Sequence, residues 1–277
     1  LRDVMYGGFW PETYAAIKPM ADGEHFARMS PDRTMILMGS FKNGEIVDTL
    51  FNAATARGFD KKHIDGYQFS PDEKLILLQT ATRGIYRHSF TAEHYIFNRK
   101  NNKAEVLSQN GAQQVPKFSP DGTMIAFVRD NNLFLVKLLF GNSESQITTD
   151  GEFRKIINGI PDWVYEEEYG FTKGYAFSPD SKKIAYLRFD ESEVPMFEMM
   201  RFDNELYNKA YRFKYPKAGD DHSIVTLHVY NLATRETRQI DTGAETNQYI
   251  PRLGYTPAGK LFFYRVNRLQ NHFEVVQ

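Results

Sequence analysis

The sequence of 277 residues contains no cysteine, which excludes disulfide bonds, cysteine-ligated zinc sites and cysteine nucleophiles. It has no excess of positive charge either, because 34 Lys and Arg stand against 35 Asp and Glu. Nucleic-acid-binding domains usually carry a basic excess or a basic stripe, so no nucleic-acid partner is expected. No apolar run approaches the ~18 residues of a membrane-spanning helix. The chain starts at Leu1 and stops at Gln277 within an apparent strand, so we expect a piece of a longer protein.

Motifs of common catalytic sites are also missing. The sequence has no Gly-x-Ser-x-Gly nucleophile elbow and no glycine-rich phosphate-binding loop, and its histidines lack the spacings His-x-His and His-x-x-x-His. Asp220-Asp221-His222 has residue types that bind metals, but its position beside Ala218-Gly219 favours a polar turn. From the residues alone we find no complete set of catalytic residues and expect no cofactor, and the pattern indicates a binding or gating module.

What the sequence does contain is a repeated turn. Aromatic residues make up 14% of the chain, which favours β-structure, and a signature ending in Ser-Pro-Asp recurs, each time before a β-rich run. Proline presets φ for a turn and Asp or Gly completes it, so each copy predicts a β-hairpin. The copies are Met29-Ser30-Pro31-Asp32, Phe69-Ser70-Pro71-Asp72, Phe118-Ser119-Pro120-Asp121 and Phe177-Ser178-Pro179-Asp180, with Tyr255-Thr256-Pro257-Ala258 as a degenerate fifth.

The spacing of these turns predicts the fold. Pro31, Pro71, Pro120, Pro179 and Pro257 follow one another at intervals of 40, 49, 59 and 78 residues. The first two intervals match the ~40–50 residue period of a four-stranded propeller blade, and the last two add insertions. A β-sandwich would show turns every ~8–12 residues without a repeated signature. We therefore predict an all-β chain, an incomplete part of a larger β-propeller with four-stranded antiparallel blades.

The 59-residue interval contains a Glu-rich insertion at about 158–171. Pro161 is placed to open a short helix and Gly170 to end it, with the carboxylates Glu166, Glu167 and Glu168 between them. Two interpretations stay open for this run: a solvated acidic turn, or a site where carboxylates converge on an ammonium group or a metal. The aromatic residues around the run favour the cation site. They are Trp163, Tyr165, Tyr169 and Phe171.

Two further segments stand out. The 78-residue interval contains a segment of about 190–217 that is rich in apolar residues and that a blade does not need. It is either a loop packed on its own blade or an arm covered by a partner. The segment from Arg83 to Phe90 places Arg83 and Arg87 near the end of a strand, where most arginines are surface ion-pair partners.

Four motifs of the sequence belong together: Asp162-Trp163-Val164-Tyr165-Glu166-Glu167-Glu168, Arg87-His88-Ser89-Phe90, Glu193-Val194-Pro195 and Tyr215-Pro216-Lys217-Ala218-Gly219. They resemble the N-terminal propeller of the dipeptidyl peptidase IV family, the prolyl-specific serine peptidases that include fibroblast activation protein. The resemblance covers nearly the whole chain, and the acidic run is its most specific part. The lack of cysteines and of Asn-x-Ser/Thr sequons suggests a bacterial member rather than an animal ectodomain. For such a member we expect a periplasmic or secreted location.

The resemblance implies an eight-bladed propeller followed by an α/β-hydrolase domain with a Ser-Asp-His triad, which releases N-terminal dipeptides ending in Pro or Ala. Glu167 and Glu168 would then bind the α-amino group of the peptide substrate, and Arg87 the carbonyl of its second residue. The extended arm at about 190–217 would form a homodimer. The hydrolase domain, a partner of the propeller, is absent from residues 1–277, so this chain alone is predicted to be inactive.

A second class of function stays open beside the peptidase. The chain would then be a non-enzymatic propeller that binds peptides or proteins. The two differ in the rest of the parent gene, where a Gly-x-Ser-x-Gly motif followed by Asp and His favours the peptidase.

Overall fold

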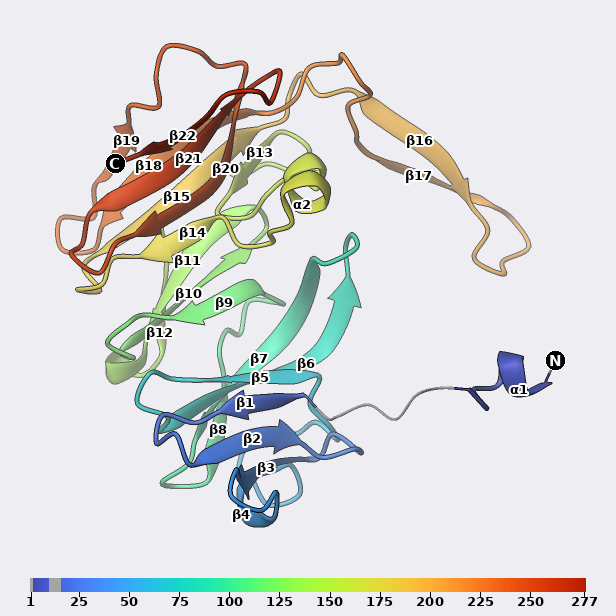
Figure 1. Cartoon of the computed structure of the whole chain (residues 1–277), viewed down its shortest axis with the longest axis vertical. Helices are drawn as coiled ribbons and strands as arrows, with labels where there is room; N and C mark the ends of the chain where they lie inside the picture. The colour runs from blue at the N-terminus through green and yellow to red at the C-terminus, as the bar shows by residue number, and fades with distance from the viewer. Residues whose placement is uncertain (1, 10–15) are drawn as a thin grey trace. The chain divides into compact units, whose positions relative to one another are not determined.

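The structure of the protein is a computed structural model that describes residues 2–9 and 16–277. The chain divides into two compact units, residues 1–80 with 95–105 and residues 81–94 with 106–277. Strands dominate in each unit (Figure 1). Within the described residues the helices are α1 (Arg2–Met5), the 3-10 helix η1 (Leu138–Phe140) and α2 (Trp163–Tyr169).

The first unit contains an antiparallel sheet in the order β1-β2-β3-β4. Its core includes Phe51, whose ring packs edge-on against Phe59 and Phe97 at centroid distances of 5.2 and 5.0 Å. A second sheet, β5-β6-β7-β8, also starts here, and residues 81–94 of its long hairpin belong to the second unit. The strands are β1 (Ile17–Pro19), β2 (His25–Met29), β3 (Met35–Ser40), β4 (Ile46–Asn52), β5 (Gly66–Phe69), β6 (Leu75–Gly84), β7 (Phe90–Asn98) and β8 (Lys103–Val106).

The second unit contains three further sheets and a separate hairpin. The sheets have the orders β12-β11-β10-β9, β13-β15-β18-β19 with β14 also paired to β15, and β20-β21-β22. The hairpin β16-β17 extends away from these sheets (Figure 1). The strands are β9 (Gln114–Phe118), β10 (Met124–Arg129), β11 (Asn132–Lys137), β12 (Ser143–Gln146), β13 (Ile156–Asn158), β14 (Tyr175–Phe177), β15 (Lys183–Asp190), β16 (Met196–Arg201), β17 (Lys209–Lys214), β18 (Ile224–Asn231), β19 (Thr237–Ile240), β20 (Gln248–Tyr255), β21 (Leu261–Asn267) and β22 (Phe273–Val276).

Each Ser-Pro-Asp signature forms the same hydrogen-bonded turn between two strands. The Ser70 hydroxyl donates to Asp72 at 2.7 Å and accepts from the backbone N–H of Leu75 at 3.0 Å. The hydrogen bond from Ser70, followed by one from Lys74, lowers the pKa of the Asp72 carboxyl to about 2. The serine therefore joins the aspartate to the first residue of the next strand. The same two bonds occur at Ser30, Ser119 and Ser178.

The turn requires a left-handed backbone at the third residue after the serine. There φ is 60° at Arg33, 56° at Glu73, 71° at Gly122 and 58° at Ser181. The left-handed region is less favourable by about 1–2 kcal/mol for a residue with a Cβ atom. In the three copies that lack glycine at this position, the hydrogen bonds of the serine and aspartate offset this conformational cost. The degenerate copy has alanine in place of the aspartate, and glycine, Gly259 with φ 80°, occupies its left-handed position.

The core of the second unit joins its three larger sheets. Tyr165, Tyr175 and Phe189 are fully buried in one cluster of apolar side chains. The Tyr175 hydroxyl donates to the backbone oxygens of Val115 at 2.6 Å and Ala126 at 2.8 Å, so this buried polar atom is satisfied. Because Tyr165 belongs to α2, the helix with the acidic run sits on this core.

The prediction of an all-β chain with four-stranded antiparallel propeller blades is confirmed. The repeated turn joins an edge strand to its neighbour at β5-β6, β9-β10, β14-β15 and β20-β21. In the first sheet it joins the two central strands, because Ile17–Pro19 adds a strand outside His25–Met29. No helix within residues 2–9 and 16–277 is long and apolar enough to cross a membrane.

Candidate functional site

The candidate site is built on α2, which lies inside the predicted Glu-rich insertion and is capped at both ends. One carboxylate oxygen of Asp162 accepts from the backbone N–H of Tyr165 at 3.0 Å, which is the N-cap bond. The other oxygen accepts from the Ser223 hydroxyl at 2.5 Å. Gly170 ends the helix with φ 64°, in the region that favours glycine. Both ends of this short helix are therefore fixed by the sequence around it.

Tyr165 anchors the middle of α2 in the core. Its side chain is fully buried, and its hydroxyl accepts from the backbone N–H of Ile250 at 3.0 Å. Its ring packs edge-on against Phe189 at 4.9 Å and lies 5.1 Å from the ring of Tyr169. At the end of the helix, Arg252 donates to the backbone oxygen of Tyr169 at 2.6 Å. An isolated helix of this length would be marginal, so these contacts hold it in place.

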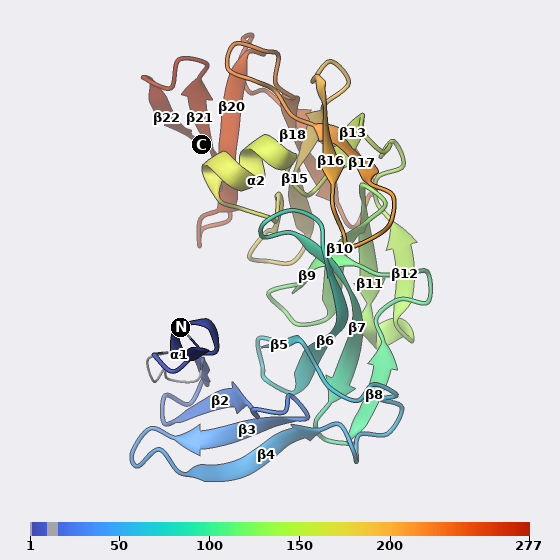
Figure 2. The same cartoon turned by 90° about the vertical axis from the view of Figure 1, so that its right-hand side faces the viewer.

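The turn between β6 and β7 meets α2 through two neighbouring glutamates. One oxygen of Glu166 accepts from the backbone N–H groups of His88 at 2.7 Å and Ser89 at 2.8 Å. The Arg87 Nε donates to a carboxylate oxygen of Glu167 at 2.8 Å. Figure 2 shows α2 beside the end of the β6-β7 hairpin. Segments 80 residues apart in the sequence are therefore brought together at this point.

Glu168 completes a group of three charged side chains with Arg87 and Glu167, which we call the carboxylate–arginine site. The side chain of Arg87 is 70% exposed and that of Glu167 is 16% exposed. Glu168 is exposed, and no other side chain of the described residues forms a hydrogen bond or an ion pair with its carboxylate. The site can therefore offer two carboxylates to a cation and a guanidinium to an oxygen acceptor.

An aromatic cluster lies next to this site, at the base of the β16-β17 hairpin. The ring of Trp163 at the start of α2 is 4.4 Å from that of Tyr215 and 6.2 Å from that of Phe213. The Phe213 ring is also 6.3 Å from that of Tyr86, which precedes Arg87. Phe213 thus contacts both segments that carry the charged side chains.

The second unit also contains a cavity of about 1190 Å³. It is lined by Tyr86 and Ser89 from the β6-β7 turn, Pro161 and Asp162 from the segment before α2, and Phe213 from the hairpin. Arg87, Glu167 and Glu168 are not among the residues that line it. The carboxylate–arginine site therefore lies next to this cavity along the chain but is not part of its wall.

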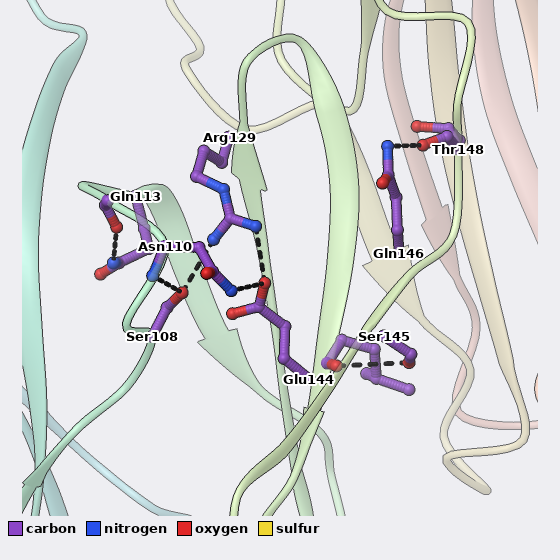
Figure 3. A network of polar contacts seen from close by, with 10 residues as sticks. Ser108, Asn110, Gln113, Arg129, Glu144, Ser145, Gln146 and Thr148 are labelled. Atoms are coloured by element: carbon purple, nitrogen blue, oxygen red, sulfur yellow. Dashed lines mark hydrogen bonds and ion pairs between the residues drawn. The ribbon is translucent and has the colours of Figure 1, made fainter.

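Another part of the cavity wall is fixed by a polar network around Arg129 (Figure 3). The guanidinium of Arg129 donates to Glu144 at 2.6 Å and to the Ser108 hydroxyl at 2.8 Å, and it stacks over Phe134 at 4.1 Å. Asn110 donates to the same oxygen of Glu144 at 3.2 Å. With these partners Arg129 holds the wall in place and is not a free cation.

Two buried carboxyls lie on the cavity wall. Burial, and next to it the negative charge of Asp162, raises the pKa of Glu191 to about 7. Burial also raises the pKa of Asp162 itself, against the hydrogen bond from Ser223. Both carboxyls therefore bind a proton more readily than exposed carboxyls do.

The structure brings together the three residues that the sequence singled out. Arg87 and Glu167 are in direct contact, and Glu168 is the next residue of the same helix. The role of Glu166 could not be read from the sequence, because three adjacent glutamates look alike until their partners are known. Asp220 closes a polar turn that starts at Lys217, through its backbone N–H and its carboxylate. His222 follows this turn and is buried, and its ring contacts the Ser223 backbone oxygen at 2.9 Å and Asn247 at 3.0 Å. In the described part of the chain, no group of three or more His, Cys, Asp and Glu residues could hold a metal ion.

Residues 70–277 match the family described as the dipeptidyl peptidase IV N-terminal region. The chain is 31% identical over 234 residues to human prolyl endopeptidase FAP, covering 83% of this chain and 29% of that protein. It is 30% identical over 274 residues to dipeptidyl peptidase 4 of Trichophyton rubrum, covering 95% of this chain and 34% of that protein.

A comparison with a solved structure agrees with these sequence matches. The crystal structure of Porphyromonas gingivalis dipeptidyl peptidase 4 superposes with a TM-score of 0.94 at 41% identity, covering 99% of this chain and 39% of that one. The chain thus spans between about three tenths and two fifths of the length of these relatives. The match of residues 70–277 covers most of the sequence, and the chain belongs to the dipeptidyl peptidase IV N-terminal-region family.

Proposed function

We propose that this chain is the substrate-anchoring and gating region of a serine dipeptidyl peptidase that releases X-Pro and X-Ala dipeptides from peptide N-termini. The observation that carries the proposal is the contact of 2.8 Å between Arg87 and Glu167, with the exposed Glu168 next to it. Family membership supports the class of reaction, and the geometry of these three side chains supports the anchoring role.

The ligand that suits two adjacent carboxylates is a protonated amine. The α-amino group of a peptide has a pKa of about 7.7–8.0, so it is largely charged near neutral pH. It offers three N–H donors, and Glu167 and Glu168 can each accept one in a charge-assisted hydrogen bond. The third donor stays free for water or a further acceptor.

Arg87 supplies the complementary half of the site. Its Nε bonds to Glu167, and within the described residues no other hydrogen bond engages the guanidinium. The terminal nitrogens can therefore donate to a peptide carbonyl close to the bound amine. Holding an amine and a carbonyl at once fixes both the position and the direction of the first residues of the substrate.

Binding of the amine at a fixed place determines which peptide bond is cleaved, at a set number of residues from the N-terminus. A peptide anchored at its N-terminus can enter only by a fixed length, so the attacked bond is always the same number of residues away. The nucleophile must lie elsewhere in the protein, because carboxylates that bind an amine do not attack a peptide carbonyl and this chain has no Gly-x-Ser-x-Gly motif.

The proposal is tested with the full-length protein that contains this chain. We expect it to release the chromophore from a Gly-Pro reporter with a free N-terminus, and we expect a serine-directed phosphonate or fluorophosphonate inhibitor to abolish the release. Binding of Gly-Pro peptides without any release would favour a non-enzymatic binding propeller. A protein that neither binds nor cleaves these peptides would contradict both the peptidase and the binding propeller.

We also propose that the β16-β17 hairpin meets a second copy of the protein. Its tip carries the exposed apolar residues Phe202, Leu206 and Tyr207, which are 76%, 89% and 81% exposed. Apolar surface of this kind is costly to leave in water and is commonly covered by a partner. The base of the hairpin packs through Phe213 on Trp163, so the tip can be changed without disturbing the base.

Replacing Phe202, Leu206 and Tyr207 together by serine should convert a dimer of the full-length protein into a monomer. The three serines keep the backbone of the hairpin and remove the apolar surface that a second subunit would cover. Sedimentation velocity gives the mass directly. An unchanged dimer would rule out the hairpin tip as the dimer contact.

A further inference from the structure

We propose that Glu166, the first glutamate of the acidic run, is a positioning residue that fixes the Arg87 turn to α2. The inference rests on the proposed function, because it concerns how Arg87 is presented to a substrate. It assigns to Glu166 a role different from that of Glu167 and Glu168, although the three are consecutive.

The carboxylate of Glu166 is buried and bonded to the backbone of the β6-β7 turn. The residue is 1% exposed, and one of its carboxylate oxygens accepts both backbone N–H groups, from His88 at 2.7 Å and from Ser89 at 2.8 Å. A ligand in solvent cannot reach this oxygen, and its two hydrogen bonds are already made within the protein.

The rest of the turn is held mainly by bonds within itself. The backbone N–H of Ile85 donates to the Ser89 oxygen at 2.8 Å, and that of Tyr86 lies 3.3 Å from the Ser89 hydroxyl. These bonds set the shape of the turn but not its place relative to α2. Within the described residues, the hydrogen bonds between the turn and α2 are the two to Glu166 and the one from Arg87 to Glu167.

The bond of Arg87 cannot hold the turn by itself. Its side chain is 70% exposed, and an ion pair with one partner in water contributes little. The buried bonds of Glu166 lie one and two residues further along the turn, so they place the backbone from which the guanidinium reaches Glu167. If they are lost, Arg87 stays in the protein but no longer has a fixed position.

The test replaces Glu166 in the full-length protein by alanine, aspartate and glutamine. Alanine removes the acceptor, and aspartate keeps the charge but withdraws the oxygens by one methylene group. We expect each to raise KM for a free-amine Gly-Pro substrate about 10- to 100-fold, with a much smaller change in kcat. Glutamine keeps one oxygen that can accept both bonds, so it should restore most of the affinity. Glu236→Ala, an exposed residue of the β18-β19 turn, is the control.

A double-mutant cycle separates positioning from a general loss of structure. If Glu166 acts through Arg87, then adding Glu166→Ala to Arg87→Ala should raise KM little beyond Arg87→Ala alone. A full additional 10- to 100-fold rise would overturn the proposal. If a thermal unfolding assay shows that the alanine variant does not fold, the same double-mutant cycle is measured with Glu166→Asp in its place.

Amide hydrogen exchange tests Glu166 without using activity. In the full-length protein we expect the His88 and Ser89 amides to exchange at least about tenfold faster in the alanine and aspartate variants, and near the wild-type rate with glutamine. Unchanged exchange would overturn the proposal even if KM rose. If instead exchange rises while Arg87→Ala leaves KM unchanged, the positioning role stands and the proposed function fails.

Discussion

Glu167→Gln and Glu168→Gln, each made in the full-length protein, are expected to lower kcat/KM for a Gly-Pro substrate by about 30-fold to several thousand-fold. The estimate takes the bound peptide to cover both carboxylates, and it uses the ~2–5 kcal/mol lost when one partner of such a buried, hydrogen-bonded charge pair is removed, at ~1.36 kcal/mol per decade. Glutamine has nearly the same size as glutamate, so the fold is retained while the attraction for the ammonium group is lost. Steady-state kinetics on purified variants measures the effect.

The two variants should not be identical. Glu167 accepts from Arg87 as well as from the proposed amine, whereas Glu168 has only the amine to bind. Because Arg87 is 70% exposed, its ion pair contributes about 0–1 kcal/mol, so the additional loss at Glu167 is at most about fivefold. A wild-type kcat/KM in either variant would contradict the assignment of that residue. Glu236→Gln, exposed and outside the site, serves as the control for handling and folding.

The fold could be predicted because its main signal is local and repeated. Ser70 bonds to Asp72 and to Leu75, all within six residues, so the turn is specified by a sequence short enough to recognise. The spacing of the copies then gave the size of a blade. The extra strand Ile17–Pro19 could not be predicted in the same way, since it pairs with Phe26 and its neighbours by backbone bonds and its side chains are exposed.

The candidate site could be predicted only in part. The short helix followed from Pro161 and Gly170, and the residue types of Glu167, Glu168 and Arg87 agreed with a family pattern. What could not be predicted was which glutamate faces inward. That depends on the approach of His88 and Ser89, 78 and 77 residues away, and no local pattern in the sequence encodes such a contact. The contact of Phe213 with both Tyr86 and Trp163 could not be predicted either, because it also joins residues that are far apart in the sequence.

Acetylation of the substrate amine is the second change with a large expected effect. An acetylated N-terminus has no positive charge and keeps only one N–H donor, while binding still removes water from the carboxylates of Glu167 and Glu168. The loss should again be about 30-fold to several thousand-fold in kcat/KM, because a charged partner is missing from the same site. Unlike a mutation, acetylation leaves the protein untouched, so a change in folding cannot explain the result.

The ratio of kcat/KM for free and N-acetylated Gly-Pro reporters, measured in the full-length protein and in its Glu167→Gln/Glu168→Gln double variant, tests the central claim most directly. The account predicts a ratio of about 30 or more in the wild-type protein. It predicts a ratio near one in the double variant, which can no longer distinguish a charged amine from a neutral amide. Equal rates for both reporters in the wild-type protein, or an unchanged ratio in the double variant, would contradict an amine-binding role for these carboxylates.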